Sequence, residues 1–503
     1  MSTTTTTNTT TSTIKSISQL SNPTILPIEG YTKPIAFTTN ILIVGGSYSG
    51  LSCLKSLKNH FKHRCSLPQY SKVLLSPDDD EIGQTQTNYP PKRVSITLIE
   101  PKSGLLNVIG IPQSIVDPKF AESQYLNYDN LKGLKFDKII SQDLQIINQF
   151  HSRLNKRNSN SIASNSTASD DIEYDETYSI EDDIDGVGNL QFGFEINFIH
   201  GKVTYLDDNK AQYSLTTTDS NSSDLPEKAM IDFDYVILAT GKDRSWPTTP
   251  LAYIPSYFIN EMIQSYTQIE NHNIISIIGA GAVGIELASD IKRKFPLKTV
   301  NLIHPHENFP PEPLSLEFKQ KVKETLIKSK VNLILNTRIK EESSNGDLIT
   351  SENKIIHSNL NYWCNSHKSN IEILSTPLLK QFKTAQNNLL INDYLQLSNT
   401  ITNHTIENFF VIGDLIEKPI IKSAGWAAYT GRQIANNLVS YLLDSKFIEP
   451  FPDVSLMPRG MVILGGDGNL VSELSGVVEL NNASYVEEYK DYCFGKIKAT
   501  LDV

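Results

Sequence analysis

Two glycine-rich turns contain the residues whose spacing suggests chemistry. The second turn, Gly279-Ala280-Gly281-Ala282-Val283-Gly284, matches the pattern G-x-G-x-x-G in full, with an apolar run before it and a helical pattern after it. Such glycines allow a tight turn, a close approach of the backbone to a pyrophosphate and close packing of the helix on the strand. The N-terminus of the helix then offers free N–H groups and a positive dipole to the phosphates. We therefore predict a dinucleotide site that includes Gly279, Gly281, Val283 and Gly284.

The first turn departs from this pattern, because Gly45-Gly46-Ser47-Tyr48-Ser49-Gly50 has serine where the middle glycine is expected. The side chain of Ser47 crowds the phosphate, but its hydroxyl can also donate a hydrogen bond to it. Glu100 ends the next apolar run, where a carboxylate can accept from a ribose hydroxyl, and this favours a ribose without a 2′-phosphate. The alternative is a turn that only resembles a nucleotide site. If the site is real, its residues are Gly45, Gly46, Ser47, Tyr48, Ser49, Gly50 and Glu100.

The elements around both turns follow the order of a doubly wound α/β domain. Strand, glycine turn, helix and strand follow one another in the first unit, with a polar insert of about 63–92 between the helix and the second strand. The same order begins again at Ile274. The predicted strands are 41–44, 94–100, 274–278, 299–304, 331–337 and 408–414, and the predicted helices are 51–57, the segment after Gly284, about 315–329 and 424–443.

Composition limits the classes of function. The 503 residues have a formal net charge of −11, but nine carboxylates lie between Asp170 and Asp185, in a Ser/Asn-rich insert of about 153–189. The rest of the chain is close to neutral and has no basic stripe, so we expect no nucleic-acid binding. Residues 1–38 form a Thr-rich tail that is predicted to be disordered. We find no apolar run typical of a membrane span or a secretory signal, and we expect a cytoplasmic location, with mitochondrial or lipid-surface association as alternatives.

The cysteines argue against metal and dithiol chemistry. All four are far apart in the sequence, and no C-x-x-C pair occurs. Neither a metal site nor a redox-active dithiol is therefore predicted. The four are Cys53, Cys65, Cys364 and Cys493.

Further motifs resemble a known family. The segment 231–247, which includes Ala239-Thr240-Gly241, and the segment 408–414, which ends in Gly413-Asp414, resemble two motifs of flavoproteins with two dinucleotide domains. The first turn, the segment 107–120 and Lys422-Ser423-Ala424 are similar to the apoptosis-inducing-factor-like branch of these oxidoreductases. This branch includes the ferroptosis suppressor proteins, and its fungal members often carry serine at the middle glycine. The resemblance extends from about Thr39 to the C-terminus, except for the two inserts.

The resemblance implies an α/β fold of the pyridine nucleotide-disulfide oxidoreductase type, with two Rossmann-like dinucleotide-binding domains, for FAD and NAD(P), and a small C-terminal α+β domain. It also implies how the chain is divided. The expected parts are the tail (1–38), the first part of the FAD-binding domain (39–250), the NAD(P)-binding domain (251–384), the second part of the FAD-binding domain (385–443) and the C-terminal domain (444–503).

The resemblance assigns roles to individual residues. Asp414 would hydrogen-bond the ribityl chain of FAD, the backbone near Val203 would bracket the adenine, and Thr240 with Gly241 would also contact FAD. Glu286 would orient the carboxamide of the nicotinamide, whereas the alternative is an exposed helical glutamate. Lys422 would stabilise negative charge on reduced flavin or bound quinone, whereas the alternative is a surface lysine.

Three positions depart from the family pattern. His304, followed by His306, ends the second strand of the NAD(P) unit. A neutral histidine tolerates a 2′-hydroxyl and a protonated one favours a 2′-phosphate, so both NADH and NADPH stay open, and the lack of an arginine in this motif slightly favours NADH. The segment 365–370 replaces the A-T-G-x-x-P-N of relatives. Gln113 stands where many relatives have arginine.

We therefore expect an FAD-dependent NAD(P)H oxidoreductase in which hydride passes from nicotinamide to flavin. The electrons then pass to an external acceptor, which in the family is typically a quinone. Relatives that reduce disulfides carry a cysteine pair beside the flavin, and this chain has none there. The expected partners are NAD(P)H and a quinone-like small molecule, while membrane contact and oligomeric state stay open. Two alternatives are a reductase of a protein electron carrier and a flavin-bound cell-death or redox signalling protein with slow, incidental reductase activity.

Overall fold

The computed structural model describes residues 38–65, 93–131, 133–148, 150, 152, 193–216, 228–365 and 368–501. The predicted Thr-rich tail and the first insert lie almost entirely outside these residues, and the acidic insert lies wholly outside them.

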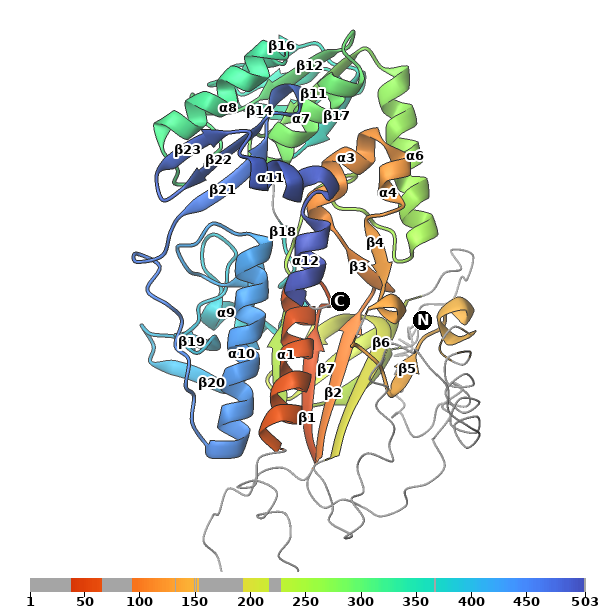
Figure 1. The fold of residues 1–503 in the computed structure, drawn as a ribbon, viewed down its shortest axis with the longest axis vertical. Helices are drawn as coiled ribbons and strands as arrows, with labels where there is room; N and C mark the ends of the chain where they lie inside the picture. The colour runs from red at the N-terminus through yellow and green to blue at the C-terminus, as the bar shows by residue number, and fades with distance from the viewer. Residues whose placement is uncertain are drawn as a thin grey trace, which may run out of the picture.

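A large sheet forms the centre of the first unit (Figure 1). Its order is β19-β20-β9-β1-β2-β6-β7-β8, with β5 beside β6. Strand β1 pairs in parallel with β2 and β9, and its residues from Ile41 to Val44 are buried on both faces, as expected of the central strand of a doubly wound sheet. The strands are β1 (Thr38–Val44), β2 (Arg93–Glu100), β5 (Lys138–Ile140), β6 (Gly193–Leu206), β7 (Lys210–Leu215), β8 (Lys228–Asp232), β9 (Tyr235–Leu238), β19 (Gln396–Asn399) and β20 (His404–Val411).

Two long helices lie side by side against this sheet, α1 (Tyr48–Cys65) and α10 (Ala424–Asp444) (Figure 1). They approach closely at Gly431, where a Cβ would overlap the carbonyl oxygen of Ser49. Because α1 follows the first turn and α10 follows the Gly413-Asp414 motif, this contact joins two segments that are far apart in the sequence.

The second unit contains a four-stranded parallel sheet of order β13-β12-β11-β17. Its core includes Ile275, Ile277, Ile285 and Leu302. A small antiparallel sheet, β14-β15-β16, lies beside it. The elements are β11 (Ile274–Ile278), β12 (Thr299–Ile303), β13 (Asn332–Ile334), β14 (Ile339–Glu342), β15 (Leu348–Thr350), β16 (Ile355–Ile356), β17 (Leu360–Trp363), α6 (Pro255–Asn271), α7 (Ala282–Lys294) and α8 (Leu316–Lys328).

The segment that follows β2 packs against the second unit. Helix α3 contacts α6 and α7, and Ile111 and Ile115 belong to the same core as Ile285. These residues were assigned from the sequence to the FAD-binding domain, so this segment contributes to both units. Its elements are β3 (Gly104–Leu106), α3 (Ile111–Val116), α4 (Pro118–Ala121) and β4 (Tyr125–Asn127).

The chain crosses between the units at a two-stranded link, β10 (Lys242–Asp243) with β18 (Lys368–Ser369). It then rejoins the first core at Ile371, and α9 (Thr376–Phe382) follows. The backbone N–H of Leu206 donates to Ile373 O at 2.7 Å, which fixes the return to β6. The chain therefore contacts the first unit again from Ile371 onward, whereas the sequence predicts a domain boundary at residue 384.

The C-terminal residues contact both units (Figure 1). The antiparallel sheet β21 (Gly460–Leu464), β22 (Leu470–Leu474) and β23 (Val477–Leu480) packs on α7 and α8. The chain continues through α11 (Ala483–Glu488) to α12 (Phe494–Leu501), which packs on α1. Across the described ranges, we find no helix with the length and apolarity needed to cross a bilayer.

Candidate functional site

The first turn has a geometry that requires glycine at its two ends. Gly45 has φ of 106°, and a Cβ there would lie 2.5 Å from the carbonyl oxygen of Ala239. A Cβ on Gly50 would overlap the carbonyl oxygen of Gly45. Ser47, in contrast, is exposed at the tip of the turn, next to the start of α1 at Tyr48. A phosphate at this tip would meet the serine hydroxyl and the N-terminus of a long helix, so the turn fits the pyrophosphate of a dinucleotide.

Glu100 and Tyr128 hold this turn in place. Glu100 is buried, and its Oε2 and Oε1 accept hydrogen bonds from Gly46 N at 2.7 Å and from Lys102 N at 3.0 Å. Tyr128 donates its hydroxyl to Gly46 O at 2.6 Å. Each carboxylate oxygen has a second lone pair, so Glu100 keeps the capacity to accept from a ribose hydroxyl.

The side chains of Tyr48 and Ser49 point into the protein. Tyr48 is buried, donates its hydroxyl to Asn107 Oδ1 at 2.7 Å and accepts from Val108 N at 3.0 Å. Ser49 is also buried, and a Cβ on Gly413 would lie 2.8 Å from its Oγ. These two residues of the turn therefore anchor neighbouring segments, and only their backbone is available to a phosphate.

The Thr240 and Asp414 motifs meet at the carboxyl ends of β9 and β20. Thr240 Oγ1 donates to Asn370 O at 2.7 Å, and Gly241, at φ of 64°, has open space at its Cβ position. Asp414 is half-buried in the short 3-10 helix that follows β20. Val203 is buried on β6. It lies three residues after His200, the residue opposite Glu100 in the parallel pairing of β2 with β6. Ligands of open α/β sheets bind at this end of the strands.

Three cations surround Asp414. Lys422 Nζ donates to Ile416 O at 2.7 Å, and Lys242 Nζ donates to Asn388 Oδ1 at 2.6 Å. Arg244 is the third, and its buried Nε has no hydrogen-bond partner among the described residues. Burial raises the pKa of Asp414, and Lys422, Arg244 and Lys242 oppose that rise. Glu417 is a second carboxylate near Lys242 and Lys422, so the three cations outnumber the two carboxylates. The remaining positive charge suits an anionic ligand.

Lys422 is therefore unlike a free surface lysine. Burial lowers its pKa from 10.5 to about 8, although Asp414 favours the charged form. Its ammonium thus titrates close to neutral pH. Sequence reasoning selected Lys422 but missed Lys242 and Arg244, even though both follow the Ala-Thr-Gly motif directly.

The second turn has the same requirement for glycine at its ends. Gly279 has φ of 111°, and a Cβ there would lie 2.8 Å from Asn365 N, while a Cβ on Gly284 would overlap the carbonyl oxygen of Gly279. Among the described residues, no atom lies within 4 Å of the Cβ position of Gly281. Val283 is partly buried. This cradle fits a second pyrophosphate. Of the altered loop 365–370, Ser366 and His367 lie outside the described residues.

Glu286 is buried in α7, which excludes the exposed helical glutamate considered from the sequence. Its Oε1 accepts from Leu464 N, on β21, at 3.3 Å. Burial raises its pKa from 4.5 to about 8, Asp290 adds to the rise and Arg244 opposes it. A carboxyl group with this pKa is mostly protonated at neutral pH and can donate a hydrogen bond.

A network around Asp290 joins three parts of the chain, and sequence reasoning missed it. Arg293 Nη2 donates to Asp290 Oδ1 at 2.8 Å and to Gln113 Oε1 at 2.9 Å. The hydroxyl of Tyr492 lies 3.1 Å from both Asp290 Oδ2 and Gln113 Oε1, and Tyr492 O accepts from Asn107 Nδ2 at 3.1 Å. Gln113 stands where many relatives have arginine. Here it accepts a hydrogen bond from the guanidinium of Arg293, on α7.

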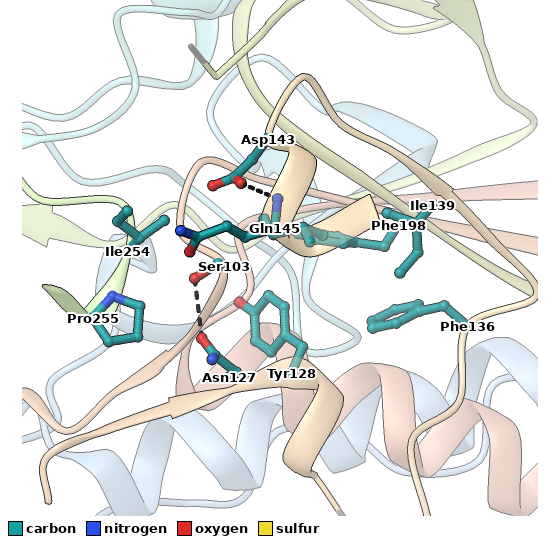
Figure 2. Close-up of a pocket in the computed structure, with 11 residues that line it drawn as sticks. Ser103, Asn127, Tyr128, Phe136, Ile139, Asp143, Gln145, Phe198, Ile254 and Pro255 are labelled. Carbon is teal, nitrogen blue, oxygen red and sulfur yellow. Dashed lines mark hydrogen bonds between the residues drawn. The ribbon is translucent and has the colours of Figure 1, made fainter. Parts of the chain in front are cut away.

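A small cavity lies behind Tyr128, between the β3–β4 hairpin and the start of α6 (Figure 2). Its volume of about 40 Å³ is enough for one or a few water molecules but not for a flavin ring. Figure 2 shows Ser103, whose hydroxyl donates to Asn127 Oδ1 at 3.2 Å, at its rim. In the described part of the chain, no group of three or more His, Cys, Asp or Glu side chains is arranged to hold a metal ion. Cys53, Cys364 and Cys493 are free thiols.

Comparison with known proteins identifies the family. The family profile described as pyridine nucleotide-disulphide oxidoreductase matches residues 141–431. This chain belongs to that family. The family's cofactors are FAD and NADH or NADPH, so the cofactors and the α/β fold class expected from the sequence are confirmed.

Individual relatives support the resemblance to the apoptosis-inducing-factor-like branch. Oxidoreductase OXR1 of Ajellomyces capsulatus is 23% identical over 465 residues, which cover 90% of this chain and 84% of that protein. Ferroptosis suppressor protein 1 of Mus musculus is 26% identical over 262 residues, which cover 49% of this chain and 64% of that protein. Apoptosis-inducing factor homolog A of Dictyostelium discoideum is 24% identical over 285 residues, covering 50% of this chain and 68% of that protein.

Solved structures show the same fold. NDH2 of Plasmodium falciparum, in complex with NADH, has a TM-score of 0.57 at 11% identity and covers 92% of this chain and 96% of that one. An NAD-dependent persulfide reductase from A. fulgidus has a TM-score of 0.52 at 15% identity and covers 87% of this chain and 64% of that one. The similarity to these structures concerns the fold only.

Proposed function

We propose that this protein is an FAD-dependent NAD(P)H oxidoreductase that passes electrons to a quinone. The observation that carries the proposal is the cationic group of Lys242, Arg244 and Lys422 around Asp414, at the carboxyl ends of β9 and β20. The branch that the sequence resembles typically reduces quinones, and the described cysteines are free thiols that the sequence separates widely.

Bound FAD would supply the redox chemistry, namely acceptance of a hydride from the nicotinamide and transfer of two electrons to the acceptor. The first turn and the N-terminus of α1 would hold the pyrophosphate of FAD, Glu100 would accept from a ribose hydroxyl, and Asp414 would hold the ribityl chain. The second turn binds the pyrophosphate of NAD(P)H. Glu286, protonated at neutral pH, orients the nicotinamide carboxamide by a hydrogen bond.

Lys422 acts on the acceptor side. With a pKa of about 8, it is charged at neutral pH and still able to release its proton. It therefore stabilises the negative charge that develops on a quinone oxygen and donates a proton to that oxygen. The hydrogen bond from Nζ to Ile416 O holds the ammonium in position.

The test is a two-step anaerobic experiment on the full-length, FAD-loaded protein. The visible flavin spectrum is recorded before and after addition of NADH or NADPH, and the reduced protein is then mixed with a short-chain ubiquinone in a stopped-flow instrument. We expect the flavin absorbance to bleach and then to return much faster with quinone than with oxygen.

The outcomes separate the alternatives. If the bleached flavin is reoxidised by quinone no faster than by oxygen, the proposed acceptor is wrong. Rapid reoxidation by a protein electron carrier alone would then identify a carrier reductase, and a long-lived reduced state would favour a signalling protein. If neither nucleotide bleaches the flavin, the proposal fails at its first step.

A further inference from the structure

The position that selects between the two coenzymes lies at the end of β12, in front of the second turn. In enzymes of this fold that bind NAD, a carboxylate at this position accepts hydrogen bonds from the ribose hydroxyls. Here the position is occupied by His304, which is buried and accepts a hydrogen bond on Nδ1 from Ala280 N at 3.2 Å. Ala280 belongs to the second turn, so His304 faces the nucleotide cradle directly.

His304 supplies neither a negative charge nor a free acceptor. Burial, together with the charges of His306 and Arg338, lowers its pKa to about 4, so the ring is neutral. Because Nδ1 accepts a hydrogen bond, the ring proton is assigned to Nε2, which is buried and has no partner in the described part of the chain. A ribose 2′-hydroxyl therefore lacks the carboxylate that would favour it here.

An arginine from another part of the chain, Arg338, lies close enough to His304 to influence its charge. The backbone N–H of Thr337 donates to His304 O at 2.9 Å, and Arg338 follows immediately. The carbonyl oxygen of Arg338 accepts from Ser351 N at 2.9 Å, so the backbone is held on both sides. The side chain of Arg338 is exposed, and within the described ranges it forms no ion pair.

The carboxylate nearest to His304 in the sequence, Glu307, already has hydrogen-bond partners. Glu307 accepts from Lys323 Nζ at 2.6 Å and from Asn336 Nδ2 at 3.0 Å. His306 is exposed, and its ring lies 5.5 Å from that of His304, measured between centroids. His304 thus has a second imidazole beside it and, nearby, a guanidinium that pairs with no carboxylate of the described residues. A guanidinium binds phosphate oxygens through paired hydrogen bonds.

We propose that Arg338 binds the 2′-phosphate of NADPH beside the neutral His304, which makes NADPH the preferred coenzyme of this protein. The proposal rests on the assignment of the second turn to NAD(P)H in the proposed function. It reverses the slight preference for NADH that the sequence suggested, because the arginine comes from the connection between β13 and β14 and not from the motif around His304.

Binding of the oxidised coenzymes tests the proposal without any electron transfer. NADP⁺ and NAD⁺, which differ only in the 2′-phosphate, are titrated by calorimetry into the full-length, FAD-loaded protein. We expect NADP⁺ to bind more tightly. In Arg338→Gln we expect the affinity for NADP⁺ to fall by about 10- to 100-fold, the usual effect of losing a charge-assisted contact, with the affinity for NAD⁺ unchanged.

A matched control is Lys354→Gln, which removes one positive charge from an exposed turn beside the same small sheet, where Lys354 pairs with Glu352 at 2.8 Å. This control should leave both affinities unchanged. Equal binding of NADP⁺ and NAD⁺ by the wild type would overturn the proposal, as would a preference for NADP⁺ that survives in Arg338→Gln.

The result is independent of the acceptor. A protein that prefers NADP⁺ through Arg338 but does not reduce quinone supports this inference and refutes the proposed acceptor. A protein that reduces quinone equally well with either coenzyme, with no effect of Arg338→Gln, refutes this inference alone.

Discussion

Replacing Glu286 by glutamine should make the stability of the protein less sensitive to pH. The substitution keeps the shape of the side chain and an oxygen that accepts from Leu464 N, but it removes the ionisable group. In the native protein, burial raises the pKa of Glu286 from 4.5 to about 8. Because the folded-state pKa is the higher one, the native state holds a proton that the unfolded state loses between these values, and stability falls as pH rises through this window.

The magnitude follows from the pKa. At about 1.4 kcal/mol for each unit of pKa, burial of the ionised carboxylate above pH 8 costs roughly 5 kcal/mol, which is an upper limit because the site relaxes. We therefore expect Glu286→Gln and wild type to be nearly equally stable at pH 5. At pH 9 the variant should be more stable by about 1 to 5 kcal/mol. Asp290, whose pKa burial raises to about 7, is present in both proteins.

The assay is urea unfolding at pH 5, 7 and 9, followed by flavin fluorescence and far-ultraviolet circular dichroism at the same excess of FAD. Glu122→Gln is the matched control, since Glu122 is exposed, and its difference from wild type should not change with pH. If the difference between Glu286→Gln and wild type is the same at pH 5 and pH 9, Glu286 is not held protonated by burial and the reasoning is refuted.

Three further substitutions test other parts of the site. Gly281→Ala should fold with an unchanged melting temperature, because its Cβ meets no atom of the described residues within 4 Å. Calorimetry should nevertheless show a loss of NADP⁺ affinity of about tenfold or more, since the backbone can no longer approach the phosphates. Lys422→Gln should slow stopped-flow reoxidation by quinone about 10- to 100-fold, whereas Lys446→Gln, at an exposed lysine, should not. Tyr492→Phe removes the hydroxyl that contacts Asp290 and should lower the urea-derived stability by about 1 to 3 kcal/mol.

Each of these expectations has a contrary result. Unchanged coenzyme affinity in Gly281→Ala would place the phosphates elsewhere. Equal reoxidation rates in Lys422→Gln and wild type would remove this lysine from the acceptor side. A Tyr492→Phe variant as stable as wild type would mean that its contact with Asp290 contributes nothing to folding.

The sequence predicted the parts of the site that depend on local order. The strand before each turn, the glycines of the turn and the helix after it lie within a few residues of one another, and periodicity and turn chemistry are sufficient to identify them. The predicted helix at 51–57 is longer in the structure, from Tyr48 to Cys65, because its polar last turns carry little of the apolar pattern. Helix α10 begins at Ala424, as predicted, where Ser423 accepts from Trp426 N as its cap.

The sequence did not predict contacts between distant segments. Arg338 comes near His304 because β12 pairs with β13 and Thr337, in the connection after β13, bonds to His304 O. The partner of Gln113 is Arg293, on a helix of the other unit. Even within a correctly placed turn, side-chain direction was not predictable, since Tyr48 points toward Asn107 and away from the phosphate position.

The path of the last residues has a consequence for how the protein works. The β21–β23 sheet rests on the coenzyme unit, α12 is embedded in the flavin unit, and Tyr492 between them is bonded to both. The segment from β21 to α12 thus connects the two units. Rotation of one unit away from the other would have to break the contacts of this segment. Coenzyme exchange is therefore expected to proceed through movement of the loops around a fixed frame, with the spacing between the two dinucleotide cradles preserved from one catalytic cycle to the next.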